Sequence, residues 1–263
     1  MSAKVLVIDL ETSPTSAWVW GLRDQNIGID QIIDNSYVFM WCAKWVGKPG
    51  VMSDSLINYP SDYRKDRKND RNIALSVRNL LDQADIVVGQ NTDKFDLKWI
   101  NQILLLHDID PPSPYHSIDL LKESRRNYYS LSHRLDFRGR QLGLGGKEPH
   151  EGFRLWLRCM TGDKSAWAKM LSYCKRDVLL TEQYYLKLRP RMHNHPNVNM
   201  FHKLEVGGRL RCPACGSPKL KAKGFRYTHS GKRQRVQCGD CRHYSTLRGK
   251  ANNSTSVTLQ SSM

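Results

Sequence analysis

The sequence predicts a mixed α/β fold, in which helices pack on a central sheet, followed by a small cysteine-containing module. The chain has 263 residues, of which 40% are hydrophobic and 25% charged, so it can bury a substantial core. Apolar patterns with strand and helix periods alternate along the first 190 residues. The composition then changes, because residues 203–250 hold 13 Lys and Arg against 2 acids.

The order of predicted elements is typical of a mixed sheet with helices packed on it. Strands are expected at residues 4–9, 36–46, 51–57, 86–89 and 115–119, the second and third forming a hairpin. Helices are expected at residues 72–85, 119–126, 130–142, 151–160 and 163–188, and another, capped by Asn91, Thr92 or Asp93, runs to about Leu106. Residues 61–70 are expected to be a loop, and residues 13–35 a loop with room for a short extended piece.

The net charge of +16 favours a polyanionic partner, most simply nucleic acid. The N-terminal residues lack a basic start followed by an apolar run and a cleavage site, so we expect no secretory signal. No apolar run is long enough to span a bilayer. We therefore expect no membrane partner and a cytoplasmic location, which would be the host cytoplasm for a phage-encoded protein. Two Cys-x-x-Cys pairs in such a setting suggest metal before disulfide.

Two acids end the first predicted strand. Because strand side chains alternate, Asp9 and Glu11 lie on the same face, where they repel each other and are costly to desolvate. A hard divalent cation such as Mg²⁺ or Mn²⁺ would suit them. Taken alone, the pair is a weak signal, since two acids at a strand end usually point at water.

Two further stretches carry polar groups at related places. Asn91 follows a predicted strand and Asp96 lies in the first turn of the next helix, where an acid also suits the helix dipole. Tyr173 and Asp177 are spaced i, i+4 on one helical face. That face borders the core, so Asp177 needs a partner, which in a purely structural role would be an arginine.

Together the three stretches resemble the motifs of the DEDD 3′–5′ exonucleases of the ribonuclease H-like superfamily. The resemblance covers about residues 4–188 and is closest to stand-alone bacterial and phage enzymes and to proofreading domains of DNA polymerases. Tyr173 stands four residues before Asp177, and Ser172 stands where the other branch has His. The chain is therefore similar to the tyrosine (DEDDy) branch, and its predicted fold is a ribonuclease H-like mixed sheet with flanking helices.

The resemblance implies two-metal hydrolysis of phosphodiester bonds with Mg²⁺ or Mn²⁺. It implies that Asp9 bridges both ions, that Glu11 and Asp177 complete the site that activates water, and that Asp96 helps to hold the second ion. Tyr173 would orient the nucleophilic water, because a phenol is a poor base at neutral pH.

The expected substrate is a single-stranded 3′ end, with DNA favoured over RNA. The resemblance places Asn91 and the backbone near Thr12 against the terminal nucleotide. Trp18 either stacks on a base or packs in the core. Lys94 either contacts a phosphate or is simply solvated. Replication or repair proteins would be natural partners, but no motif identifies one.

The two cysteine pairs predict a structural zinc site. Four thiolates, from Cys212, Cys215, Cys238 and Cys241, suit one tetrahedral Zn²⁺ and leave no open catalytic position. The residues between the pairs are long enough for a β-hairpin, and the module is similar to zinc ribbons of nucleic-acid proteins. Its basic and aromatic residues are expected to bind nucleic acid.

These expectations divide the chain into an exonuclease domain (1–190), a linker (191–210), a zinc ribbon that tethers substrate (211–248) and a disordered tail (249–263). Two rivals remain, a non-catalytic nucleic-acid-binding protein on the same scaffold and an RNA-directed exonuclease. An endonuclease of the same superfamily is disfavoured by Tyr173 and Asp96. The segment 143–147 is read as a turn and not as a phosphate loop, since Gln141 and Glu148 break that motif.

Overall fold

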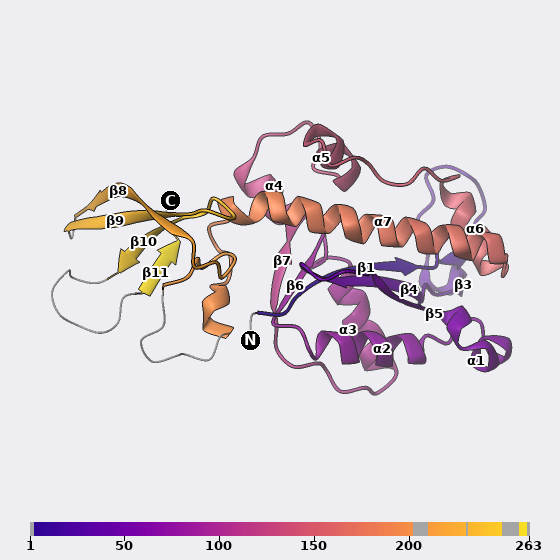
Figure 1. Cartoon of the computed structure of the whole chain (residues 1–263). Coiled ribbons are helices and arrows are strands. Elements are labelled where there is room, and N and C mark those ends of the chain that lie inside the picture. The colour runs from indigo at the N-terminus through magenta and orange to yellow at the C-terminus, as the bar shows by residue number, and fades with distance from the viewer. Residues whose placement is uncertain (1–2, 202–209, 230, 249–257, 262–263) are drawn as a thin grey trace.

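The computed structural model describes residues 3–201, 210–229, 231–248 and 258–261. Five strands form the main sheet in the order β5-β4-β1-β6-β7 (Figure 1). They are β1 (Val5–Thr12), β4 (Val38–Trp45), β5 (Met52–Ser55), β6 (Ile86–Gly89) and β7 (His116–Asp119). The central strand β1 pairs antiparallel with β4 and parallel with β6. The predicted mixed α/β sheet is therefore confirmed.

Helices cover both faces of this sheet. They are α1 (Pro60–Lys65), α2 (Arg71–Leu81), α3 (Asp96–Leu106), α4 (Leu120–Asn127), α5 (Leu135–Gln141), α6 (Phe153–Met160) and α7 (Lys164–Leu188). The long helix α7 packs on β1 and β4 from one side, and α2 and α3 lie on the other (Figure 1). Because β4 is covered on both faces, its sequence is an almost continuous apolar and aromatic run.

One buried ion pair fastens α7 to the sheet. The ammonium group of Lys44 on β4 lies 2.8 Å from a carboxylate oxygen of Glu182 on α7. The same oxygen accepts the backbone N–H of Gly47 at 3.1 Å. A buried charge needs such partners, and here they fix the position of α7 across the strand that neighbours β1.

Two local predictions are wrong. Residues 61–70 are not simply a loop, because α1 begins at Pro60, whose fixed φ suits the first position of a helix. The helix after β6 begins at Asp96 with Phe95 at its N-cap, and no side chain caps it. Asn91 instead adopts a positive φ of 65°, and its carbonyl accepts the N–H groups of Lys94 and Phe95. A tight turn thus takes the place of the expected cap.

A second sheet follows α7. Its order is β11-β10-β9-β8, built from β8 (Leu220–Thr228), β9 (Gly231–Cys238), β10 (Tyr244–Arg248) and β11 (Thr258–Ser261). The hairpin expected between the cysteine pairs is present as β8 and β9. The predicted disordered tail is wrong for Thr258–Ser261, which pair with β10. The rest of that tail lies outside the described residues, as do residues 202–209 of the predicted linker.

Short segments complete the described chain. They are β2 (Ser16–Ala17), β3 (Ile32–Asp34) and the 3-10 turns Ile29–Gln31, Leu56–Asn58, Arg189–Arg191 and Val198–Phe201. In the part of the chain that the structure describes, no helix combines the length and apolarity that a membrane crossing requires.

Candidate functional site

Three elements bring the four predicted acids together. Asp9 and Glu11 project from β1, Asp96 from the first turn of α3, and Asp177 from the middle of α7. The backbone N–H of Leu10 donates to Oδ1 of Asp96 at 3.0 Å, which ties the start of α3 to β1. The cluster is thus built where the sheet meets helices from both of its faces.

Burial makes this acid cluster electrostatically costly. Desolvation, followed by the charges of Asp177 and Asp96, raises the pKa of Asp9 well above its usual value. Desolvation and Asp9 do the same to the pKa of Glu11, and desolvation raises the pKa of Asp96 to about 7. Loss of hydration on burial is the common cause, and repulsion between the acids adds to it at Asp9 and Glu11, so the site favours bound cations or protons.

Lys147 supplies a cation that the sequence analysis missed. Its ammonium group contacts Oδ2 of Asp177 and lies 2.8 Å from the hydroxyl of Tyr173. Burial lowers the pKa of Lys147, but Asp177 and Tyr173 outweigh it and raise that pKa overall, so the ammonium stays charged. The partner of Asp177 is thus this lysine from another segment, in place of the arginine that a purely structural role would require.

A glycine-rich loop between α5 and α6 positions Lys147 beside Asp177. Gly143 and Gly145 have positive φ, and a Cβ on Gly145 would lie 2.7 Å from the Arg176 guanidinium. Arg176 on α7 donates to the Gly146 carbonyl at 3.0 Å, and the N–H of Lys147 donates to Asp136 at 2.8 Å. The segment is a turn, as predicted. The sequence signal that could have identified Lys147 as a site residue is its position directly after flexible glycines.

Aromatic rings hold Tyr173 in place. His150 meets its ring edge-on at 4.8 Å between centroids, and Trp156 does so at 6.0 Å. Burial, followed by the charge of Asp177, raises the pKa of Tyr173. The hydroxyl therefore remains protonated at neutral pH and serves as a fixed donor and acceptor beside Asp177.

A thiol touches the first acid. Cys174 lies next to Tyr173 in sequence, and its Sγ is 3.7 Å from a carboxylate oxygen of Asp9. Ligand atoms of Asp9, Glu11 and Cys174 lie within 4.8 Å of one another. Cys42, Cys159 and Cys174 are all buried.

A cavity of about 810 Å³ opens beside the acids. Its lining combines Asp9, Asp177 and Lys147 with polar and basic groups from the turn after β6, from α4 and from the segment that leads into α5, including Asn91, Lys94, Arg125 and Arg134. Asn91 and Lys94 are thus brought to the site. The lining includes neither Thr12 nor Trp18, and Trp18 is 76% exposed, so it does not pack in the core.

Asp119 has a structural role. Its carboxylate caps α4 by accepting the N–H of Leu121 at 2.9 Å, and it also accepts the N–H of Asn91 at 3.0 Å. It thereby fixes the turn that presents Asn91 to the cavity.

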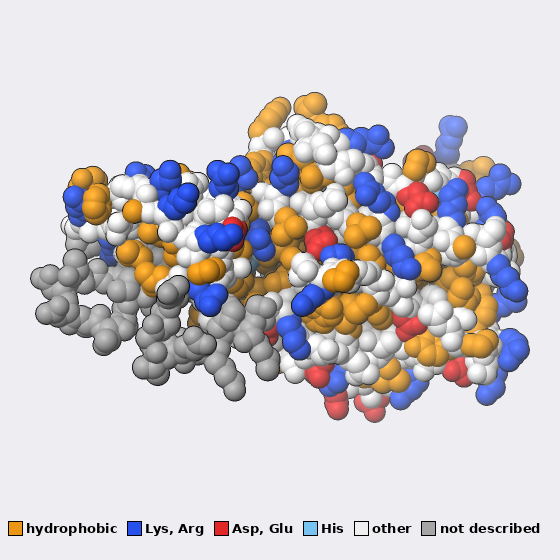
Figure 2. Space-filling model, viewed as in Figure 1, with side chains coloured by type: hydrophobic (Ala, Val, Ile, Leu, Met, Phe, Trp, Pro, Cys, Tyr) orange, Lys and Arg blue, Asp and Glu red, His pale blue; other side chains and the backbone are white. Residues whose placement is uncertain are grey.

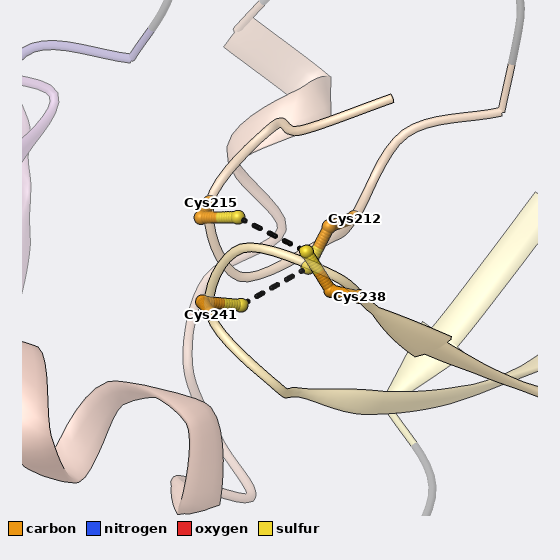
Figure 3. Close-up of side chains that lie close together, drawn as sticks. All are labelled: Cys212, Cys215, Cys238 and Cys241. Carbon is orange, nitrogen blue, oxygen red and sulfur yellow. Dashed lines mark hydrogen bonds between the residues drawn. The ribbon is translucent and has the colours of Figure 1, made fainter. Parts of the chain in front are cut away.

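The four module cysteines converge from two turns (Figure 3). The Sγ atoms of Cys212 and Cys241 are 3.6 Å apart and those of Cys215 and Cys238 are 3.7 Å apart, and all four lie within 4.8 Å. Tetrahedral zinc with Zn–S bonds of about 2.3 Å needs sulfur atoms about 3.8 Å apart. These four thiols match that spacing.

Comparisons with known proteins bear on the family and the fold of the chain. A model of the RNase H superfamily matches residues 48–189, a segment that contains Asp96, Tyr173 and Asp177 but not Asp9 or Glu11. No curated protein matches the chain.

Among solved structures, the family B DNA polymerase from the hyperthermophilic archaeon Pyrobaculum calidifontis is similar at a TM-score of 0.52 and 15% identity. The match covers 72% of this chain and 25% of that polymerase, so it concerns the fold of one part of a much longer protein. Because the superfamily match spans more than half of the residues, the chain belongs to the RNase H superfamily.

Proposed function

We propose that this chain is a metal-dependent 3′–5′ exonuclease of the tyrosine (DEDDy) branch, with single-stranded DNA as its favoured substrate. One observation carries the proposal: four carboxylates from β1, α3 and α7 lie close enough to affect each other's charge, and two of them, Asp9 and Asp177, line an open cavity next to Lys147 and Tyr173. A structural role alone would not require four acids in one place, because each adds repulsion to the others.

The donor set fits divalent ions such as Mg²⁺ or Mn²⁺. Oδ1 of Asp177 is buried and has no hydrogen-bond partner among the described residues, which leaves it available as a ligand. Hard ions prefer carboxylate oxygens. Asp9, Glu11, Asp96 and Asp177 would hold two ions, which when bound would stabilise charge on the attacking and leaving oxygens of the phosphodiester.

Tyr173 and Lys147 would act on the other reactants. The Tyr173 hydroxyl stays protonated, so it would orient the attacking water by hydrogen bonding and would not act as the base. Lys147 neutralises Asp177 and lines the cavity, so its ammonium group would also attract the phosphate that enters there.

The cavity supports attack at the end of a strand. Its volume lies within the range of small-ligand sites, which suits terminal nucleotides better than the body of a duplex. Lys94, Arg125 and Arg134 would contact the phosphates that neighbour the scissile one. Asn91 would hydrogen-bond the terminal nucleotide. The exposed Trp18, outside the cavity lining, is not needed for this role.

We further propose that residues 211–248 are a zinc ribbon that binds nucleic acid. No Asp or Glu occurs between residues 206 and 239, and Lys and Arg side chains gather over β8 and β9 (Figure 2). Arg226 and Arg233 lie opposite each other in the strand register, an arrangement that a bound polyanion would stabilise. On the other face, the Lys232 ammonium group lies 3.9 Å from the centroid of the Phe225 ring. An aromatic ring beside a cation is a surface suited to the stacking of bases.

The decisive experiment is a digestion ladder. Matched single strands of DNA and RNA, labelled at the 5′ end, are incubated with the protein and Mg²⁺ or Mn²⁺. We expect stepwise shortening from the 3′ end, faster on DNA. A ladder that starts at the 5′ end or internal cleavage of a circular strand would refute the exonuclease assignment, and binding without any cleavage would favour the non-catalytic rival.

A further inference from the structure

The second sheet is fastened to the end of α7. Three hydrogen bonds cross between the segment after α7 and the cysteine turns, each 2.9 Å long: Val198 N–H to the Pro213 carbonyl, Asn199 Nδ2 to the Arg211 carbonyl, and His243 Nδ1 to the Pro190 carbonyl. His195 and Val198, which the sequence assigns to a linker, are buried. The cysteine turns thus sit directly on the nuclease domain (Figure 1).

A polar stack lies beneath the cysteines. The hydroxyl of Tyr185 on α7 is 2.7 Å from Nε2 of His195, and the two rings stack at 5.8 Å between centroids. The guanidinium of Arg189, the residue that follows α7, lies over the Tyr185 ring at 5.7 Å. A cavity of about 390 Å³ connects Arg189 to Cys215 and Cys241.

The charge of a zinc-loaded cysteine centre would need a cation at this junction. Four thiolates around one divalent ion leave a net charge of about −2, and a partly buried anion of that kind needs nearby donors. Arg189 lines the same cavity as two of the thiols, and its Nε is buried with no hydrogen-bond partner among the described residues. Asp240 lines this cavity too, but its carboxylate is paired with Lys219 of the module itself at 3.1 Å.

We propose that Arg189 is the counter-charge of the zinc-loaded cysteine centre, and that zinc binding therefore locks the ribbon onto α7. This inference rests on the proposed zinc site. It makes the ribbon a fixed extension of the nuclease domain, in place of the loose tether that the sequence suggested. Arg189 lies twelve residues beyond Asp177, or about 18 Å along the helix axis. One nucleic acid strand would then contact the ribbon and the acids in a constant register.

Zinc retention in the full chain tests the counter-charge. Zinc release to a chelating indicator is measured for the wild type, Arg189→Gln, Arg189→Lys and the control Arg191→Gln, whose side chain is exposed on the same turn. We expect zinc affinity to fall about 10- to 100-fold in Arg189→Gln, as for other groups around metal ligands. Arg189→Lys should keep most of the wild-type zinc affinity, and Arg191→Gln should keep all of it.

Hydrogen exchange tests the locking. The N–H of Val198 donates across the junction, so peptides that contain it should exchange slowly in zinc-loaded wild type and faster after zinc removal or in Arg189→Gln. Circular dichroism of each variant checks that the nuclease domain stays folded. If wild type holds no zinc, the zinc site itself is wrong. If all variants hold zinc equally and hydrogen exchange at Val198 does not depend on zinc, the zinc site is supported. The coupling of zinc binding to the docking of the ribbon on α7 is then refuted.

Discussion

The ammonium group of Lys147 contacts the carboxylate of Asp177, although thirty residues separate them and they lie on different elements. This pair gives the acid cluster a built-in counter-ion. A divalent cation would compete for the same carboxylate, so the lysine and the metal should substitute for each other in stabilising the fold. Four predictions follow from the charge balance of the site.

The first concerns Lys147→Met, which keeps the length of the side chain and removes its charge. Without divalent ions, the free energy of unfolding should fall by about 1–3 kcal/mol, less than for a fully buried pair because a third of the lysine side chain is exposed. With saturating Mg²⁺ the difference from wild type should shrink. Urea unfolding with and without Mg²⁺ measures both, and Lys187→Met on the exposed side of α7 is the control. An equal loss in both conditions would argue against the counter-ion role.

The second concerns pH. A carboxyl whose pKa rises on folding contributes stability below its unfolded pKa, and that stability is lost as the pH rises through the folded pKa. For Asp96 the window runs from about 4 to about 7, and Asp9 and Glu11 shift in the same direction. Metal-free protein should therefore lose stability from pH 5 to pH 8, and Mg²⁺ should raise its melting temperature more at pH 8.

Thermal unfolding across this range, after dialysis that removes Mg²⁺ but would leave zinc at the four cysteines, measures the effect. Asp96→Asn removes one titrating group and should flatten the profile. Superimposable pH profiles for the variant and the wild type would contradict the raised pKa of the buried Asp96 carboxyl.

The third uses two neighbouring arginines on α4. Arg125 lines the cavity, whereas Arg126 points elsewhere and lies 3.7 Å from Glu123. Arg125→Ala should raise KM for a short single strand about 3- to 10-fold and lower the slope of log K against log salt by about 1. Arg126→Ala should change KM less than about twofold. Equal effects of the two substitutions would show that the cavity does not direct the strand.

The sequence was sufficient to predict those site residues whose relative position follows from local periodicity. Asp9 and Glu11 share a strand face, and Tyr173 and Asp177 share a helical face, so their spacing alone predicted that each pair would act together. Lys147 could not be found in this way, because its place depends on how the loop after α5 folds back over α7 and is held by Arg176 and Asp136.

The junction at Arg189 was missed for a similar reason. Residues 191–210 have the composition of a linker, and only the docked cysteine turns reveal that His195 and Val198 are buried. The start of α1 is a smaller case: the charges of residues 61–70 favour a loop, whereas Pro60 suits a first helical turn. At Lys147 and at the junction the deciding contacts are made by residues far apart in the chain, whereas the signal for α1 is local.

The fourth prediction tests the central claim, that the four carboxylates form a hydrolytic metal site. Asp177→Asn keeps the shape of the side chain and removes the charge that holds a cation. The rate of 3′-terminal nucleotide release from a 5′-labelled single strand, at saturating Mn²⁺, should fall on the order of 10³-fold, because charge stabilisation at the reacting phosphate is lost. Circular dichroism and strand binding should stay close to wild type. A variant that cleaves at the wild-type rate would contradict the proposed site.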